Sequence, residues 1–133
     1  MINKSKKILS EISAGELLDK LSILEIKLKK IKKKSSQIQI KKEYQILKKI
    51  QNSPIKMDRK IRKLFTSIKA VNLKLWNIED KLRICEKNKK FDIDFIKLAR
   101  DVYFNNDKRS RIKLEINKKL GSNIREIKQY VKY

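Results

Sequence analysis

The stretch SAGELLDKLSILEIKLKK, residues 13–30, decides the fold class. It opens with a helix-start signature, because Ser13 can cap a helix and Glu16, three residues later, can reach back as a capping box. The apolar residues that follow recur at steps of four and three, the period of a helix face that packs on another helix. They are Leu17, Leu21, Leu24, Leu28 and Ile31. This pattern predicts a helix from residue 13 to about residue 34.

A second apolar edge runs along the same helix through Ile23 and Ile26. Two apolar faces indicate that the helix lies centrally and touches two neighbours. Asp19 shares the second edge, so we expect its carboxyl group to be partly buried.

The remainder of the chain shows the same helical period. It predicts helices over about 37–51, 55–88, 93–104 and up to 120, followed by a short helix carrying Ile124, Ile127 and Val131 after Gly121. Cys85 falls on the apolar seam of the long helix over 55–88, which favours a core residue over a nucleophile. Short connections favour antiparallel neighbours. The predicted fold is all-α: a single-domain antiparallel helical bundle of five to six helices over residues 1–133. Its first and third helices are long, and residues 1–12 form an N-terminal segment that can be flexible.

The composition of the 133 residues excludes several function classes. Two Gly and one Pro leave too few tight turns for a β-sandwich or barrel. The absence of His and the single Cys exclude imidazole catalysis, disulfide scaffolds and ordinary zinc sites. We therefore expect no cofactor and no metal. Since no stretch resembles a signal peptide or a membrane span, we expect a cytoplasmic protein.

The net charge of +22 comes from 37 Lys or Arg against 15 Asp or Glu. Thirty of the basic residues are Lys, and Ile is also very common, as expected for an AT-rich genome. Mutational drift can place Lys on any solvated helix face, so the excess is weak support for a nucleic-acid partner. A surface of this charge should still bind polyanions nonspecifically at low salt.

Three stretches are poor in Lys: 13–20, 75–83 with Glu86, and 98–109. The second and third also mix acids, arginines and aromatic residues. On the helix predicted over 55–88, which holds the second stretch, a polar stripe borders the core seam at steps of four and three. It comprises Asn72, Trp76, Glu79, Arg83 and Glu86. One interpretation is a salt-bridge ladder on the helix surface, since Glu79 and Arg83 are an i,i+4 pair and Arg83 and Glu86 an i,i+3 pair. The other is a cleft in which Asn72 and Arg83 bind an anionic or polar ligand beside Trp76.

The third stretch leaves two geometries open. If the helix over 93–104 continues, Asn106, Arg109 and Lys113 enter its core stripe and should meet acids such as Glu79 or Asp19, or a ligand. If the chain breaks at residues 105–107, free amides at a new helix start could bind phosphate beside Arg109 and Lys113. The candidate ligand-binding set is therefore Glu16, Asp19, Lys20, Asn72, Trp76, Glu79, Arg83, Arg100, Tyr103, Asn106, Arg109 and Lys113.

The motifs SAGELLDKLSILEIK (13–27), LWNIEDKLR (75–83) and ARDVYFNNDKR (99–109) resemble a family of small bacterial domains of unknown function. The resemblance implies an all-helical fold in domains that occur alone or beside tetratricopeptide and glycosyltransferase-type modules. That association implies a context in surface-polysaccharide assembly, and no reaction comes with it.

Three functions follow as hypotheses. The favoured one is an accessory factor whose polar cluster binds an anionic small molecule, phosphate-bearing or nucleotide-sugar-like, or a partner protein. The second is a nucleic-acid-binding protein that uses the Lys-rich faces. The third is a small enzyme with Glu79 or Asp19 as base and Arg83, Arg100 and Arg109 as charge clamps. The sequence does not predict the oligomeric state.

Overall fold

The computed structural model describes residues 6–52 and 54–133, and within them the chain forms four helices and no strand. These are α1 (Ala14–Lys30), α2 (Lys34–Asn52), α3 (Arg59–Lys87) and α4 (Ile93–Lys119). The all-α prediction is confirmed, whereas the prediction of five to six helices is wrong. Of the predicted N-terminal segment, residues 1–5 lie outside the described residues, and residues 6–12 are non-helical.

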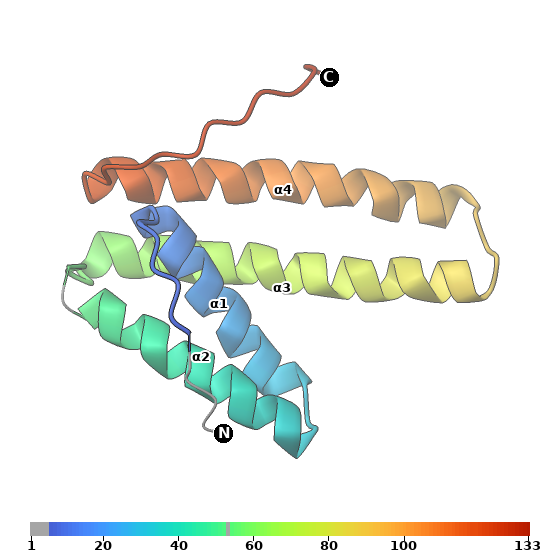
Figure 1. Cartoon of the computed structure of the whole chain (residues 1–133). Coiled ribbons are helices and arrows are strands. Elements are labelled where there is room, and N and C mark those ends of the chain that lie inside the picture. Colours follow the sequence, from blue (N-terminus) through green and yellow to red (C-terminus); the bar gives the residue numbers. More distant parts are fainter. Residues whose placement is uncertain (1–5, 53) are drawn as a thin grey trace.

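Helices α3 and α4 form a long antiparallel hairpin, and α1 crosses one face of it (Figure 1). Helix α1 contacts all three other helices, while α2 contacts α1. The central position expected for the first helix is therefore confirmed. None of the helices within the described ranges is long and apolar enough to cross a membrane.

The core forms where α1 meets the hairpin. Ser13 caps α1 as predicted, its Oγ accepting a hydrogen bond from the Glu16 amide at 3.1 Å. The carboxylate of Glu16 does not complete a capping box, because it accepts a hydrogen bond from Lys113 instead. The buried cluster around this start comprises Leu17, Leu18, Leu21, Ile55, Ile61 and Ile116. The apolar side chains of α1 are thus buried against α3, α4 and the connection that precedes α3, and this burial fixes the position of α1 on the hairpin.

Two boundaries differ from the predicted ones. Helix α1 ends at Lys30, four residues earlier than expected, where Ile31 turns to an extended conformation. Helix α3 begins at Arg59 with Asp58 as its cap, the Oδ1 of Asp58 accepting from the Ile61 amide at 2.9 Å. Ile55 was expected to start this helix, but it lies in the connection and is buried in the core cluster.

Residues 93–119 form one continuous helix, so the first of the two geometries left open by the sequence is confirmed. The alternative, a break at residues 105–107 with a phosphate site at a new helix start, is wrong. The buried side chain of Asn105 donates a hydrogen bond to the Asp101 carbonyl at 2.8 Å, one turn back within the helix. Further along the helix, Arg109 pairs with Asp19 of α1, and Lys113 pairs with Glu16 of α1. Because these charges are paired, the helix gains nothing by breaking there.

The short helix expected after Gly121 does not form, and residues 123–133 follow α4 without helical structure (Figure 1). Gly121 has φ of +61°, which ends α4. Ile127 and Val131, expected to point inward, are 88% and 92% exposed. An isolated helix of about ten residues is marginal in water without apolar contacts. We call residues 123–133 the C-terminal tail.

Candidate functional site

A buried polar network joins α1, α3 and α4. Asp19 is only 1% exposed, and its carboxylate accepts hydrogen bonds from Nε of Arg109 at 2.9 Å and Nη2 of Arg109 at 2.5 Å. Nδ2 of Asn72 donates to Oδ1 of Asp19 and to Oγ of Ser22, both at 2.8 Å. Oγ of Ser22 donates in turn to the Asp19 carbonyl at 2.7 Å. Every buried side-chain polar atom of the described residues has a hydrogen-bond partner, so this network is complete.

The network fixes the orientation of the Arg109 guanidinium group. The hydrogen bonds that Arg109 donates to the Asp19 carboxylate raise the pKa of Arg109, against the opposing effect of burial. Arg109 uses two of its five N–H bonds on Asp19, since it presents the side formed by Nε and Nη2. The remaining donors stay available on the side of the group that faces away from Asp19.

A cleft of about 440 Å³ lies above this network, between α1, α3 and α4. Six of the predicted site residues line it: Asn72, Trp76, Glu79, Arg83, Asn106 and Arg109. Asp80, Leu75, Ile23 and Ile26 complete its walls. Asp19 lies beneath it, so seven of the twelve predicted residues gather at one place.

The salt-bridge ladder proposed for α3 does not form. No ion pair within residues 6–52 and 54–133 involves Glu79 or Arg83. Glu86 pairs instead with Lys89 at 3.4 Å. Arg83 therefore stands at the rim of the cleft with its guanidinium group exposed and without a described acidic partner.

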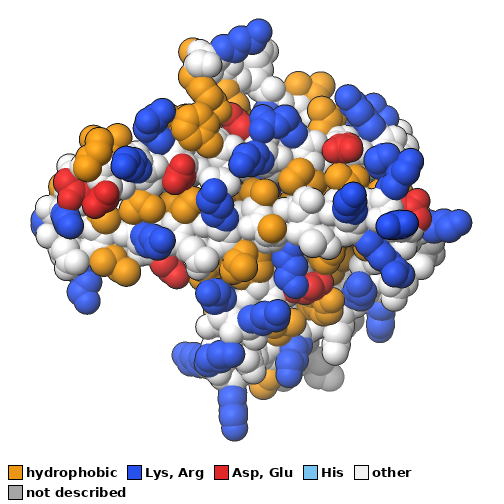
Figure 2. Space-filling view, turned by 180° about the vertical axis from the view of Figure 1, so that it is seen from behind, with side chains coloured by type: hydrophobic (Ala, Val, Ile, Leu, Met, Phe, Trp, Pro, Cys, Tyr) orange, Lys and Arg blue, Asp and Glu red, His pale blue; other side chains and the backbone are white. Residues whose placement is uncertain are grey.

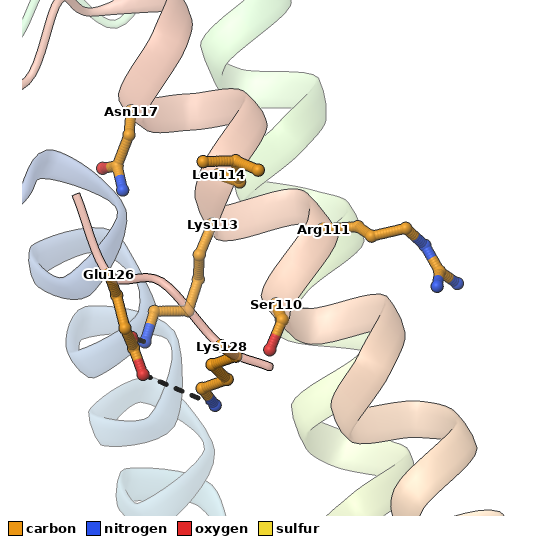
Figure 3. Close-up of a pocket in the computed structure, with 7 residues that line it drawn as sticks. All are labelled: Ser110, Arg111, Lys113, Leu114, Asn117, Glu126 and Lys128. Carbon is orange, nitrogen blue, oxygen red and sulfur yellow. Dashed lines mark hydrogen bonds and ion pairs between the residues drawn. The ribbon is translucent and has the colours of Figure 1, made fainter. Parts of the chain in front are cut away.

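Glu16 and Lys113 form a second cluster further along α4. Nζ of Lys113 donates to Oε2 of Glu16 at 2.7 Å and to Oε2 of Glu126, in the C-terminal tail, at 2.9 Å. Burial alone would lower the pKa of Lys113, but the hydrogen bonds to the two carboxylates outweigh it and the pKa is raised. Figure 3 shows the side chains of Lys113 and Glu126 meeting across a shallow pocket between α4 and the tail, where Lys128 also reaches Glu126.

Two side chains at and just after the end of α4, close to the second cluster, hold the start of α1 against that helix. The Gly15 amide donates to Oδ1 of Asn117 at 2.6 Å, and the Ala14 amide donates to Oγ of Ser122 at 3.1 Å. These contacts satisfy amides that have no partner within the helix. They require a close approach of the two backbones at Gly15.

The other predicted residues lie outside the cleft. Lys20 is exposed beside the segment that precedes α1. The guanidinium group of Arg100 lies 5.6 Å from the centre of the Phe104 ring. Tyr103 packs against Phe104 and Tyr133, with ring centres 4.8 and 5.4 Å apart, and Tyr133 hydrogen-bonds to Asp107.

Sequence reasoning missed five residues of the two clusters: Gly15, Ser22, Asp80, Asn117 and Glu126. Ser22 lies three residues after Asp19, so helical spacing could have placed both on one face. Asp80 lies in the motif over 75–83 already singled out. The partners of Lys113 and Gly15 come from segments about 13 and 100 residues away in the chain, and helical periodicity carries no signal for them.

Acidification below pH 4.5 should release the C-terminal tail from α4. The hydrogen bond from Lys113 holds the pKa of Glu126 below its usual value of 4.5, with burial partly opposing. A carboxyl group with a depressed pKa in the folded state contributes stability above its unfolded pKa, and this is lost as the pH falls through the folded pKa. The carboxyl ¹³C shift of Glu126 and tail amide exchange would follow the release by NMR. The Glu126→Gln variant should have a released tail at neutral pH, and a Glu126 pKa of 4.5 or above would contradict the prediction.

The protein is thus a small all-α domain in which α1 crosses the α3–α4 hairpin. Its polar site lies between these helices, where Arg109, paired with Asp19, lines an open cleft. Residues 8–132 match DUF6165, a family of unknown function, and the chain belongs to that family. No curated protein and no solved structure matches the chain. The expected membership of a family of unknown function is confirmed, while the expected neighbouring modules stay a prediction.

Proposed function

We propose that the cleft between α1, α3 and α4 binds a small anionic molecule through a phosphate or carboxylate group. The observation that carries this proposal is the state of Arg109. Its guanidinium group is oriented by Asp19 through two hydrogen bonds and still lines the cleft with its remaining donors. A guanidinium group fixed in this way loses little conformational entropy when it binds an anion, and its planar donor pattern matches phosphate and carboxylate oxygens.

Arg83 supplies a second positive group at the rim of the same cleft. Its exposed side chain has no described acidic partner, so a ligand does not have to displace an ion pair to reach it. Asp19, in contrast, is buried under Arg109 and acts by positioning it. Asp19 is therefore not accessible as a base, so the enzyme hypothesis would depend on Glu79, which lines the cleft.

The remaining lining of the cleft suggests the class of ligand. Trp76 offers a half-buried aromatic face, and Glu79 and Asp80 offer carboxylates that can accept hydrogen bonds from hydroxyl groups. Aromatic, acidic and basic groups together suit a phosphorylated sugar or a nucleotide sugar. Such a ligand would agree with an accessory role in surface-glycan assembly, the context implied by the family resemblance.

Fluorescence of the single tryptophan tests the proposal directly, because Trp76 lines the cleft. Glucose 1-phosphate, a nucleotide sugar and inorganic pyrophosphate are titrated at about 0.3 M salt, where the Debye length is below about 8 Å and nonspecific attraction is weak. We expect saturable quenching by at least one of the two sugar-containing probes. Arg83→Met should weaken this binding at least tenfold, because a hydrogen bond to a charged group contributes about 1.5–3 kcal/mol.

The matched control is Arg62→Met, which removes an exposed arginine from the opposite half of the same helix. It should bind like the wild type. Equal loss in both variants, together with binding that disappears as salt is raised, would indicate nonspecific polyanion binding by the basic surface and would contradict the cleft proposal. The cleft proposal would also be rejected if no probe shows saturable binding at concentrations up to about 1 mM, since a dissociation constant of that size corresponds to only about −4 kcal/mol.

A further inference from the structure

The far end of the α3–α4 hairpin extends beyond α1 and α2, and no third element among residues 6–52 and 54–133 packs on it (Figure 1). A groove of about 310 Å³ lies there, lined by residues of α3, α4 and the turn between them: Lys81, Ile84, Cys85, Asn88, Lys90, Asp92, Asp94 and Leu98. Ile84 is 57% exposed at this groove. Cys85, expected in the core, is only half-buried.

The apolar seam of the hairpin is less buried at this end than in the body. Near α1, the seam residues Ile61, Ile68 and Ile116 are almost completely buried. Towards the turn, the corresponding residues are only half-buried: Leu82, Cys85, Phe95, Leu98 and Val102. Two helices alone cannot enclose the side chains between them, and helix pairs normally complete this burial by packing on a second pair.

The charge of this end also differs from that of the remaining chain. Residues 79–101 carry seven Lys or Arg and six Asp or Glu, which leaves 30 basic and nine acidic residues elsewhere. The groove itself is balanced, with Lys81 and Lys90 against Asp92 and Asp94. Figure 2, which views the molecule from behind, shows acidic and basic side chains interspersed with apolar ones over the hairpin end.

We propose that this groove binds the same groove of a second copy of the chain, so that two hairpin ends form a symmetric four-helix arrangement. A two-fold interface brings one patch against itself, so it must be self-complementary. A patch with two lysines, two aspartates and an exposed isoleucine meets that condition, because Lys81 can face Asp94 of the second copy. Lys90 and Asp92 already pair within the chain at 3.5 Å and add no net charge to the patch. An unrelated basic or acidic partner would find no net opposite charge in this patch.

The position of the groove also reduces repulsion between two copies with a charge of +22. Contact at the protruding hairpin ends keeps the strongly basic bodies apart, and their residual repulsion is screened by salt. We therefore expect dimerisation to strengthen as salt rises. Nonspecific complexes with polyanions change in the opposite direction, which separates the two kinds of association.

The single cysteine allows a direct test without engineered residues, since Cys85 lines the groove. We expect a dissociation constant in the micromolar range, about −8 kcal/mol. Sedimentation of the full chain at about 100 μM, well above that constant, should therefore show a dimer. A short bis-maleimide should crosslink Cys85 to Cys85 of the second copy, and no crosslink should form when the reaction is run on diluted, monomeric protein.

Ile84→Lys places a charge in the groove and should abolish both the dimer and the crosslink. The exposed Ile84 contributes little to the fold, and circular dichroism would check that the variant remains helical. The control Ile38→Lys makes the same change at an exposed position of α2 and should dimerise like the wild type. A monomeric wild type at about 100 μM, or a dimer that withstands Ile84→Lys, would overturn the proposal.

Discussion

The free energy of unfolding of the Asp19→Asn variant should be about 2–4 kcal/mol lower than that of the wild type, with a Tm lower by roughly 10 °C. Asparagine keeps the shape of the side chain but cannot balance the charge of Arg109. Breaking a fully buried ion pair costs about 3–5 kcal/mol, and the 29% exposure of the Arg109 side chain to solvent reduces this cost. Since a domain has only about 5–15 kcal/mol of stability in total, this is the largest single effect we expect.

Asp80→Asn is the matched control, because it makes the same chemical change at an exposed carboxylate of the cleft. Thermal and urea unfolding followed by circular dichroism should show a change within about 0.5 kcal/mol for this control. Equal stability of the Asp19→Asn and Asp80→Asn proteins would show that Asp19 does not hold Arg109 in solution. The support for an oriented anion site would then be lost as well.

A double variant separates stability from binding at the same position. Replacing a buried ion pair by apolar residues of similar volume is often neutral or stabilising. Asp19→Leu combined with Arg109→Met should therefore be more stable than Asp19→Asn alone, while losing the proposed ligand binding. A double variant that still binds sugar phosphate with wild-type affinity would place the binding site elsewhere on the molecule.

The sequence predicted those features that depend on residues close together in the chain. The cap at Ser13, the burial of Asp19 and the seam of α1 from Leu17 to Leu24 follow from helical spacing, and all three are confirmed. The seam does not continue to Ile31, which lies beyond the end of the helix. The polar stripe of α3 predicted Asn72, Trp76 and Arg83 on one face, and they line one cleft. These predictions succeeded because a period of 3.6 residues determines which side chains share a face.

The features that failed depend on partners distant in the chain. Ser122, Glu126 and Lys128 looked like the start and body of a last helix, because they follow the glycine that ends α4. In the structure Ser122 binds the start of α1, and Glu126 binds Lys113. Similarly, the local sequence could not decide between a break at residues 105–107 and a continuous helix, because that choice depends on Asp19 of α1 reaching Arg109. Tertiary contacts outweighed local turn signals in both cases.

Gly15→Ala should also destabilise the protein, by about 1–3 kcal/mol, although alanine is the better helix former by about 1 kcal/mol. A methyl group at this position would lie 2.5 Å from the Lys113 carbonyl oxygen and 2.9 Å from Oδ1 of Asn117. The first contact is with backbone, so the start of α1 has to move away from α4. This movement would also weaken the hydrogen bond from the Gly15 amide to Asn117 and the ion pair between Glu16 and Lys113.

The double variant Gly15→Ala, Asn117→Ala identifies which contact is responsible. Truncating Asn117 removes the side-chain oxygen but leaves the Lys113 carbonyl in place, so stability should not recover. If the double variant regains wild-type stability in thermal unfolding, the side chain of Asn117 would be the obstacle and the two backbones would be further apart than 2.5 Å implies. Glycine at position 15 is therefore required by the close approach of α1 to α4, which also sets the distance from Asp19 to Arg109. A small residue at the start of α1 thus controls the geometry of the proposed anion site one turn further along the helix.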